Sequence, residues 1–249
     1  MTVCWLGNAG WRISPGPEGR YPCGKILIDP DLEPGSHRIT LEGIPDDCVK
    51  TADAVLITHE HGDHFNIPTA RRLVQESGCV FVLPKSCMNT AKKANIPPER
   101  IITARHGEPV EAAGVNITPT PAIHGHILGS IYKHYDAADC GYLLSFSGIS
   151  LFHPGDSVLL QEHLELPGVD VLIISPTEHN THVRQSKVLI DKLKPKYIFP
   201  QHRDTYHINE ENSFWTRAYD KELYEALSPG QKERFHTLAQ GREFEITEV

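Results

Sequence analysis

Residues 54–64 read AVLITHEHGDH, a short apolar run followed directly by four potential metal ligands. The apolar part predicts a buried strand, and the ligands follow where that strand ends. His59 and His61 are two residues apart, so in extended backbone their side chains project to the same side. Asp63 and His64 come where the chain is expected to turn into a helix, and there they can face a second ion. Imidazole and carboxylate ligands together suit Zn, Mn or Fe.

This stretch resembles the H-x-H-x-D-H signature of the metallo-β-lactamase superfamily, and the wider pattern spans residues 3–207. Members of that family carry a later His, then an Asp in a Gly-Asp pair, and a final His after a strand. The candidates for these positions are His124, Asp156 and His202. The resemblance implies one ion held by His59, His61 and His124, a second held by Asp63, His64 and His202, and Asp156 as the bridge between them.

Two other histidines near these positions need an interpretation. His126 lies two residues after His124, so either could be the ligand, and His124 is preferred because it follows Pro-Ala-Ile at a predicted strand end. His153 comes shortly before Asp156, where many relatives carry a His that is not a ligand. We expect His153 to orient Asp156 or a neighbour rather than to bind metal.

Four further residues are candidates for substrate binding. His179 and His182 follow a predicted apolar strand and should lie on the same rim as the metal loops. Arg203 and Tyr206 come just after the final His, where a cation and a phenol could bind an anionic group. A solvated polar surface is the alternative for each of them.

Strand and helix patterns alternate in two similar halves, which predicts an α/β fold. The resemblance makes this an αββα sandwich of two mixed β-sheets flanked by helices, with residues 1–249 as a single domain. The predicted helices are 68–77, 86–94 (capped by Ser86), 183–192 and 214–227. The predicted strands are 3–6, 11–13, 25–29, 54–57, 79–83, 101–103, 109–111, 115–120, 141–147, 149–152, 169–174, 196–200 and 243–247.

Composition limits the partners and the compartment. The 249 residues carry a net charge of −8, which argues against nonspecific nucleic-acid binding because phosphate affinity needs clustered Lys and Arg. Six scattered cysteines suggest free thiols in a reducing compartment. With no apparent signal peptide and no apolar run of about 20 residues, we expect a cytoplasmic protein that does not enter membranes. The acidic charge and the lack of a membrane segment fit a small-molecule substrate. A homo-oligomer is possible on this composition.

The resemblance also implies a mechanism and a cofactor. Two divalent ions ~3.5–4 Å apart would share a hydroxide that attacks an electrophilic carbon or phosphorus. Asp63 is expected to hydrogen-bond to this hydroxide, to guide it and to take a proton as the intermediate collapses. Zn is the favoured metal, and Mn or Fe also fit.

Three short segments point to one branch of the family. Residues 5–10 (WLGNAG), 26–30 (ILIDP) and 199–204 (FPQHRD) resemble the L-ascorbate-6-phosphate lactonase branch, although the sequence departs from it at His124. The leading hypothesis is therefore hydrolysis of a small lactone or ester, with or without a phosphate group. The alternatives are a phosphodiesterase with the same dinuclear centre and a non-catalytic metal-binding protein.

Overall fold

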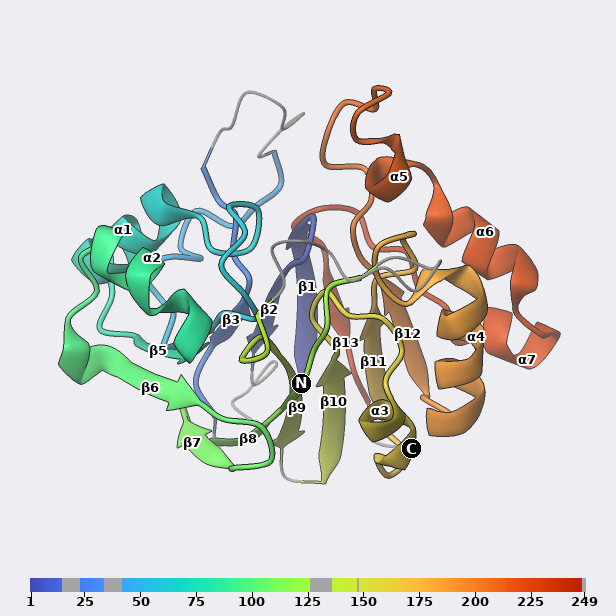
Figure 1. The fold of residues 1–249 in the computed structure, drawn as a ribbon, viewed down its shortest axis with the longest axis horizontal. Helices are drawn as coiled ribbons and strands as arrows, with labels where there is room; N and C mark the ends of the chain where they lie inside the picture. Colours follow the sequence, from blue (N-terminus) through green and yellow to red (C-terminus); the bar gives the residue numbers. More distant parts are fainter. Residues whose placement is uncertain (15–22, 34–41, 126–135, 147, 248–249) are drawn as a thin grey trace.

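The computed structural model describes residues 1–14, 23–33, 42–125, 136–146 and 148–247. Within these residues, thirteen strands form two mixed sheets that pack face to face, and helices cover both outer faces (Figure 1). This arrangement confirms the predicted αββα sandwich.

The first sheet is built mainly from the N-terminal half of the chain. In spatial order it contains β13 (Glu243–Glu245), β1 (Thr2–Gly7), β2 (Gly10–Ser14), β3 (Ile26–Ile28), β4 (Ala54–Leu56), β5 (Val80–Pro84) and β6 (Ile101–Ala104). Strands β3 to β6 pair in parallel, whereas the pairs from β13 to β3 are antiparallel. The carboxyl ends of the parallel strands therefore meet at one edge of the sheet.

The second sheet comes from the middle and later parts of the chain. Its spatial order is β12 (Tyr197–Pro200), β11 (Val171–Ile174), β10 (Ile149–His153), β9 (Cys140–Phe146), β8 (Val115–Pro121) and β7 (Val110–Ala112). Strands β10, β11 and β12 are parallel and the other pairs are antiparallel. Gly148 supplies the left-handed backbone, with φ of 99°, in the predicted turn between β9 and β10.

Alternation along the strands divides the core into layers. In β4, Ala54 and Leu56 face the second sheet, whereas Val55 packs with the helices outside. Between the sheets the rings of Trp11 and Phe199 lie 5.7 Å apart. The hydroxyl of Tyr142 in β9 donates to a carbonyl oxygen just after β4, at 2.7 Å, so the two sheets are also joined where the ligand stretch begins.

The helices lie on the two outer faces. Helices α1 (Ile67–Glu76) and α2 (Met88–Lys93) pack on the first sheet, and α4 (His182–Leu193) and α6 (Tyr219–Ala226) pack on the second (Figure 1). As predicted, Pro68 lies in the first turn of α1, and the Asn66 side chain accepts the Thr69 N–H at 2.9 Å. The remaining short helices are α3 (Gln161–Glu165), α5 (Ser213–Thr216), α7 (Pro229–Lys232), η2 (Lys85–Cys87) and η3 (Pro98–Arg100).

Two helix predictions need correction. The single helix expected across 214–227 is two helices, α5 and α6, because Arg217 between them has extended backbone with φ of −66° and ψ of 169°. Ser86 does not cap the helix that follows it. Its hydroxyl instead donates to the carboxylate of Asp139 at 2.7 Å.

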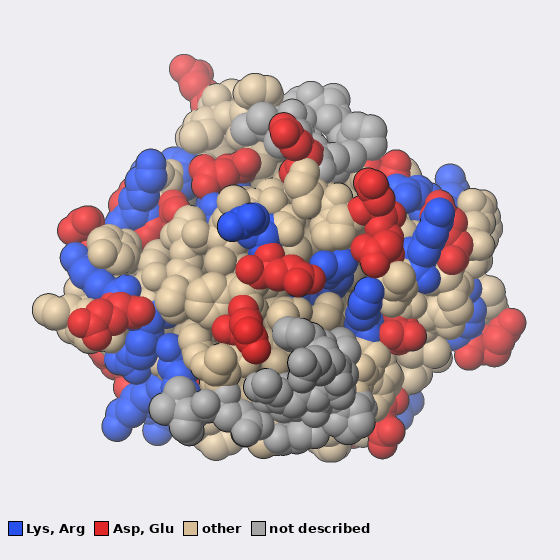
Figure 2. All heavy atoms as spheres, turned by 180° about the vertical axis from the view of Figure 1, so that it is seen from behind, with Lys and Arg blue, Asp and Glu red and all other residues tan. Residues whose placement is uncertain are grey.

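The charged surface and the cysteines of the structure match the expectations drawn from the composition. Figure 2 shows Lys and Arg interspersed with Asp and Glu over the face it presents. None of the helices in the described parts of the chain is long and apolar enough to cross a membrane. All six cysteines are free thiols, as predicted, and five of them are buried.

Candidate metal centre

The predicted metal ligands come from loops that follow four strands at one edge of the sandwich. The loop after β4 supplies four of them, and the segments after β8, β10 and β12 supply one each. The structure brings together His59, His61, Asp63, His64, His124, Asp156 and His202. His126 lies outside the described residues.

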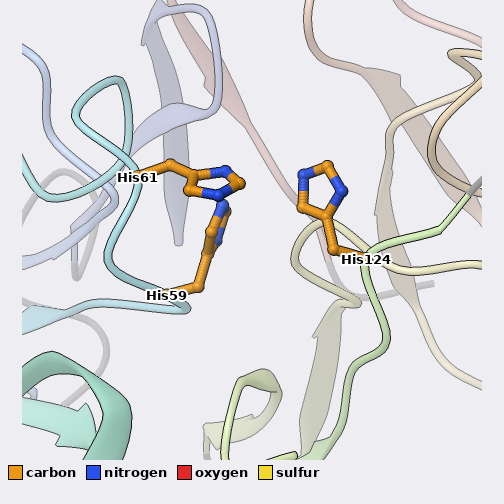
Figure 3. A group of neighbouring side chains, drawn as sticks. All are labelled: His59, His61 and His124. Carbon is orange, nitrogen blue, oxygen red and sulfur yellow. The ribbon is translucent and has the colours of Figure 1, made fainter. Parts of the chain in front are cut away.

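The first ligand group consists of three histidines. Figure 3 shows His59 and His61 projecting from the loop after β4, with His124 facing them from the segment after β8. The ring centroids of His59 and His61 lie 4.5 Å apart, and those of His61 and His124 lie 4.9 Å apart. One nitrogen of each ring lies within 4.8 Å of the others, so the three side chains converge on a common point where an ion could bind.

Asp156 lies between this group and the second one, which is formed by Asp63, His64 and His202. Its Oδ1 is 2.8 Å from the Nε2 of His202, and its Oδ2 is 3.2 Å from the Nε2 of His124 and 3.5 Å from that of His64. Burial alone would raise the pKa of Asp156, but the His202 and His64 imidazoles hold this pKa well below its usual range. The carboxylate is therefore ionised at neutral pH and reaches both groups, as a bridging ligand must.

A buried nitrogen shows that the residues fit a metal ion. The Nε2 atom of His59 is buried and has no hydrogen-bond partner among the described residues. Its other ring nitrogen, Nδ1, lies 2.9 Å from the Thr58 hydroxyl. An unsatisfied buried polar atom costs about 1–3 kcal/mol, and a cation at this position would satisfy it. Histidine and carboxylate ligands of this kind suit Zn, Mn or Fe.

Asp29, at the end of β3, orients two of the ligands from behind. Its Oδ2 lies 2.8 Å from the His64 Nδ1 and accepts the Thr58 hydroxyl at 2.6 Å. Since Thr58 donates to Asp29, it accepts from the His59 Nδ1. Both imidazoles therefore present Nε2 to the centre.

We expect Asp29→Asn to weaken Zn²⁺ binding about 10–100-fold. The carboxylate of Asp29 contacts both the His64 Nδ1 and the Thr58 hydroxyl, and an uncharged amide with a single oxygen cannot replace it at both. Asn is the suitable replacement because Asp29 has φ of 43°, a conformation that Asn tolerates. Competition with a chromophoric chelator measures the affinity. The exposed Asp46, changed to Asn, is the matched control, and equal affinities for the two variants would refute the role of Asp29.

Asp63 is, like His61, a predicted ligand that is only partly buried. Its Oδ2 accepts from the Asn8 side-chain amide at 3.0 Å. Burial would raise its pKa, but His64 and His202 lower this pKa below the ordinary value. An ionised carboxylate with one oxygen fixed by Asn8 can accept a proton from a group in the neighbouring cavity.

Metal binding at pH 7 is expected to release about one proton per chain, and the source is His64. Burial lowers the pKa of His64, but Asp156, Asp63 and Asp29 together raise it well above 6.5, so the metal-free ring holds a proton that a metal must displace. Burial and neighbouring imidazoles lower the pKa of His61 to about 4, so this ring is already neutral. The affinity for Zn²⁺ should therefore rise with pH near neutrality.

Titration calorimetry in two buffers of different ionisation enthalpy counts the released protons. A binding enthalpy that does not depend on the buffer would contradict this assignment for His64.

A cavity of about 440 Å³ opens beside the ligands. Of the four residues predicted to bind substrate, His179 and Tyr206 line it and His182 does not. His182 begins α4 instead. Arg203 is buried, with its guanidinium 3.9 Å from the ring centroid of Trp5 and hydrogen-bonded to Asp204 at 2.9 Å. It is not among the described residues that line the cavity.

His179 lies closer to the ligands than its sequence position indicated. Its Nε2 is 3.4 Å from the Oδ2 of Asp156, and its Nδ1 is 3.2 Å from the Thr177 hydroxyl. Burial lowers its pKa to about 4, so the ring is neutral at pH 7. His153 also supports Asp156, because its Nδ1 accepts the Gly155 N–H at 3.1 Å in the turn that leads to the carboxylate.

Several residues of this site were not predicted from the sequence. They are Asn8 and Asp29, which hold ligands from behind, and Asn209, Glu211, Asn212, Phe214 and Trp215, which line the cavity. Asp29 could have been found from the parallel pairing of β3 with β4, which places the ends of these strands side by side. No motif in the sequence marks the cavity residues.

Comparison with known proteins identifies the relatives of this chain. The family model described as "Beta-lactamase superfamily domain" matches residues 25–202. A UPF0173 metal-dependent hydrolase of Carboxydothermus hydrogenoformans is 29% identical over 212 residues, covering 84% of this chain and 87% of the relative. One from Thermococcus kodakarensis is 29% identical over 243 residues, covering 93% and 98%. The metallo hydrolase Igni18 of Ignicoccus hospitalis shares the fold, with a TM-score of 0.69 at 19% identity and 99% of each chain covered.

Proposed function

Because this chain belongs to the metallo-β-lactamase superfamily, we propose that it is a metal-dependent hydrolase that acts on a small lactone or related ester. The observation that carries the proposal is the position of Asp156, whose two carboxylate oxygens contact histidines of both ligand groups. Zn is our first choice of metal, with Mn or Fe next. Divalent ions held there would activate a water and polarise the oxygen of the scissile bond.

The chain itself supplies the proton transfer and the positioning. Asp63 lines the cavity and is ionised, so it can accept the proton of the attacking water and pass it to the leaving oxygen. The Asn8 amide holds one of its oxygens at 3.0 Å, which fixes the direction of the other. Asp29 keeps His59 and His64 in the tautomers that leave Nε2 free.

The surroundings of the site favour a small substrate. A cavity of about 440 Å³ accommodates a compact organic molecule. The net charge of −8 and the free thiols support a role in a reducing compartment, the cytoplasm, without nucleic acid or membrane as partner.

Acid release in a pH-stat tests the proposal. Zn- and Mn-loaded protein is assayed on sugar lactones, sugar-phosphate lactones and phosphodiesters, with Asp63→Asn as the control for contaminating enzymes. Release from lactones that the control lacks supports the proposal. Release from phosphodiesters alone would make the protein a phosphodiesterase, and silence from fully metal-loaded protein would leave a non-catalytic metal-binding protein.

A further inference from the structure

The cavity has a second wall that faces the metal ligands. This wall comes from the loop before α5 and from α5 itself, which stand above the strand ends at the edge of the sandwich (Figure 1). Three of its residues are aromatic, namely Tyr206, Phe214 and Trp215. The wall therefore has the composition of a binding surface for an apolar group.

The aromatic rings form a connected surface next to the ligands. The ring centroids of Tyr206 and Trp215 lie 5.2 Å apart, and those of Phe214 and His179 lie 5.4 Å apart. Trp215 also approaches the ligand His202, at 6.2 Å. The Tyr206 hydroxyl donates to Asp31 at 2.9 Å, so a bound molecule meets the ring more than the hydroxyl. Phe214 is 36% exposed, which leaves apolar area for a ligand to cover.

The side chains described around the cavity offer no cation to an anionic group at the aromatic wall. None of the described residues that line it is Lys or Arg, whereas Glu211 adds a carboxylate to those of Asp63 and Asp156. Arg203 is stacked on Trp5, and Arg217 is engaged with Glu178 at 3.4 Å and with the ring of Tyr219. A phosphate or carboxylate group packed against this wall would therefore lose its hydration without gaining a cationic partner among the described side chains.

On the basis of the hydrolase function proposed above, we propose that the substrate carries an uncharged aryl or alkyl group that packs against the aromatic wall, with Trp215 as the main contact. The carbonyl carbon then faces the ligand cluster. Lactones that carry phosphate or carboxylate in place of the apolar group are poor substrates, which separates this protein from enzymes that act on sugar phosphates.

Three γ-butyrolactones that differ in one substituent test this specificity. The substituent at the γ-carbon is hydrogen, phenyl or carboxylate, and hydrolysis by the Zn-loaded protein is followed in a pH-stat. Burial of a phenyl group predicts a kcat/KM about 10–100-fold higher for the phenyl lactone than for the carboxylate lactone. Equal rates, or a preference for the carboxylate, would overturn the inference while leaving the hydrolase function intact.

Variants at Trp215 test whether the aromatic wall causes the preference for the phenyl lactone. Trp215→Ala is expected to lower kcat/KM for the phenyl lactone about 10-fold more than it lowers kcat/KM for the unsubstituted lactone, which removes most of the phenyl advantage. Trp215→Phe should restore most of it. Tyr224→Ala, at an exposed aromatic on α6, is the matched control and should change nothing. An equal loss on all three lactones would show that Trp215 supports the fold and does not select the substrate.

A binding measurement separates this inference from the proposed function. If none of the lactones is hydrolysed, the proposed function fails. Calorimetry of the same three compounds with Zn-loaded protein then still measures whether the aromatic wall binds the phenyl lactone more tightly than the carboxylate lactone. Tighter binding of the phenyl lactone supports an apolar site. Equal or tighter binding of the carboxylate lactone refutes it.

Discussion

Replacing Asp156 with Asn is expected to lower kcat/KM about 10²–10⁴-fold and to reduce the bound metal below two ions per chain. The carboxylate of Asp156 lies 2.8 Å from His202 and 3.2 Å from His124, so this single side chain reaches both groups. An amide has a single acceptor oxygen and no charge, and it cannot serve both sides. The rate is measured on the best lactone and the metal content by plasma mass spectrometry.

Asp156 is buried, so the variant has to be checked for folding. Circular dichroism and the melting temperature establish this, and Asp46→Asn, at an exposed carboxylate, is the control for the substitution itself. A folded Asp156→Asn protein that keeps two ions and full activity would contradict the bridging role.

The second large effect is expected for Asp63→Asn, which should lower kcat about 10²–10⁴-fold while the ion of the histidine group stays bound. Asp63 is an ionised carboxylate that lines the cavity, and the amide that replaces it cannot accept the proton that the reaction releases. The ligands His59, His61 and His124 are untouched by the change. Single-turnover kinetics and metal analysis of the same sample separate the loss of proton transfer from the loss of metal.

Glu60→Gln provides the matched control for Asp63, because Glu60 is an exposed carboxylate in the same loop. It should retain the activity of the unchanged protein. If Asp63→Asn also remains fully active, another group takes the proton, and the mechanism derived for this cavity is wrong.

Much of the fold could be predicted because its determinants are local. Apolar segments of three to seven residues mark the strands, and the four ligands of residues 59–64 follow one of them directly. Once β4, β8, β10 and β12 end at the same edge, their loops bring distant ligands together. This outcome depends on strand order, which only the family resemblance supplied.

The positions of Arg203, Phe214 and Trp215 could not be predicted, because they depend on local backbone turns that the periodicity of the sequence does not encode. Arg203 follows a ligand, but His202 and Asp204 on either side have φ of 54° and 49°, and the chain turns its guanidinium toward Trp5. Phe214 and Trp215 were expected within a single helix across residues 214–227. The extended backbone at Arg217 ends that helix early, and both rings line the cavity instead.

The most direct test of the central claim is the number of metal ions that the protein binds. Protein stripped with a chelator is titrated with Zn²⁺, passed through a desalting column and analysed by plasma mass spectrometry. The position of Asp156 between two ligand groups predicts two ions per chain, both retained through the column. One ion or none in correctly folded protein would contradict the dinuclear centre.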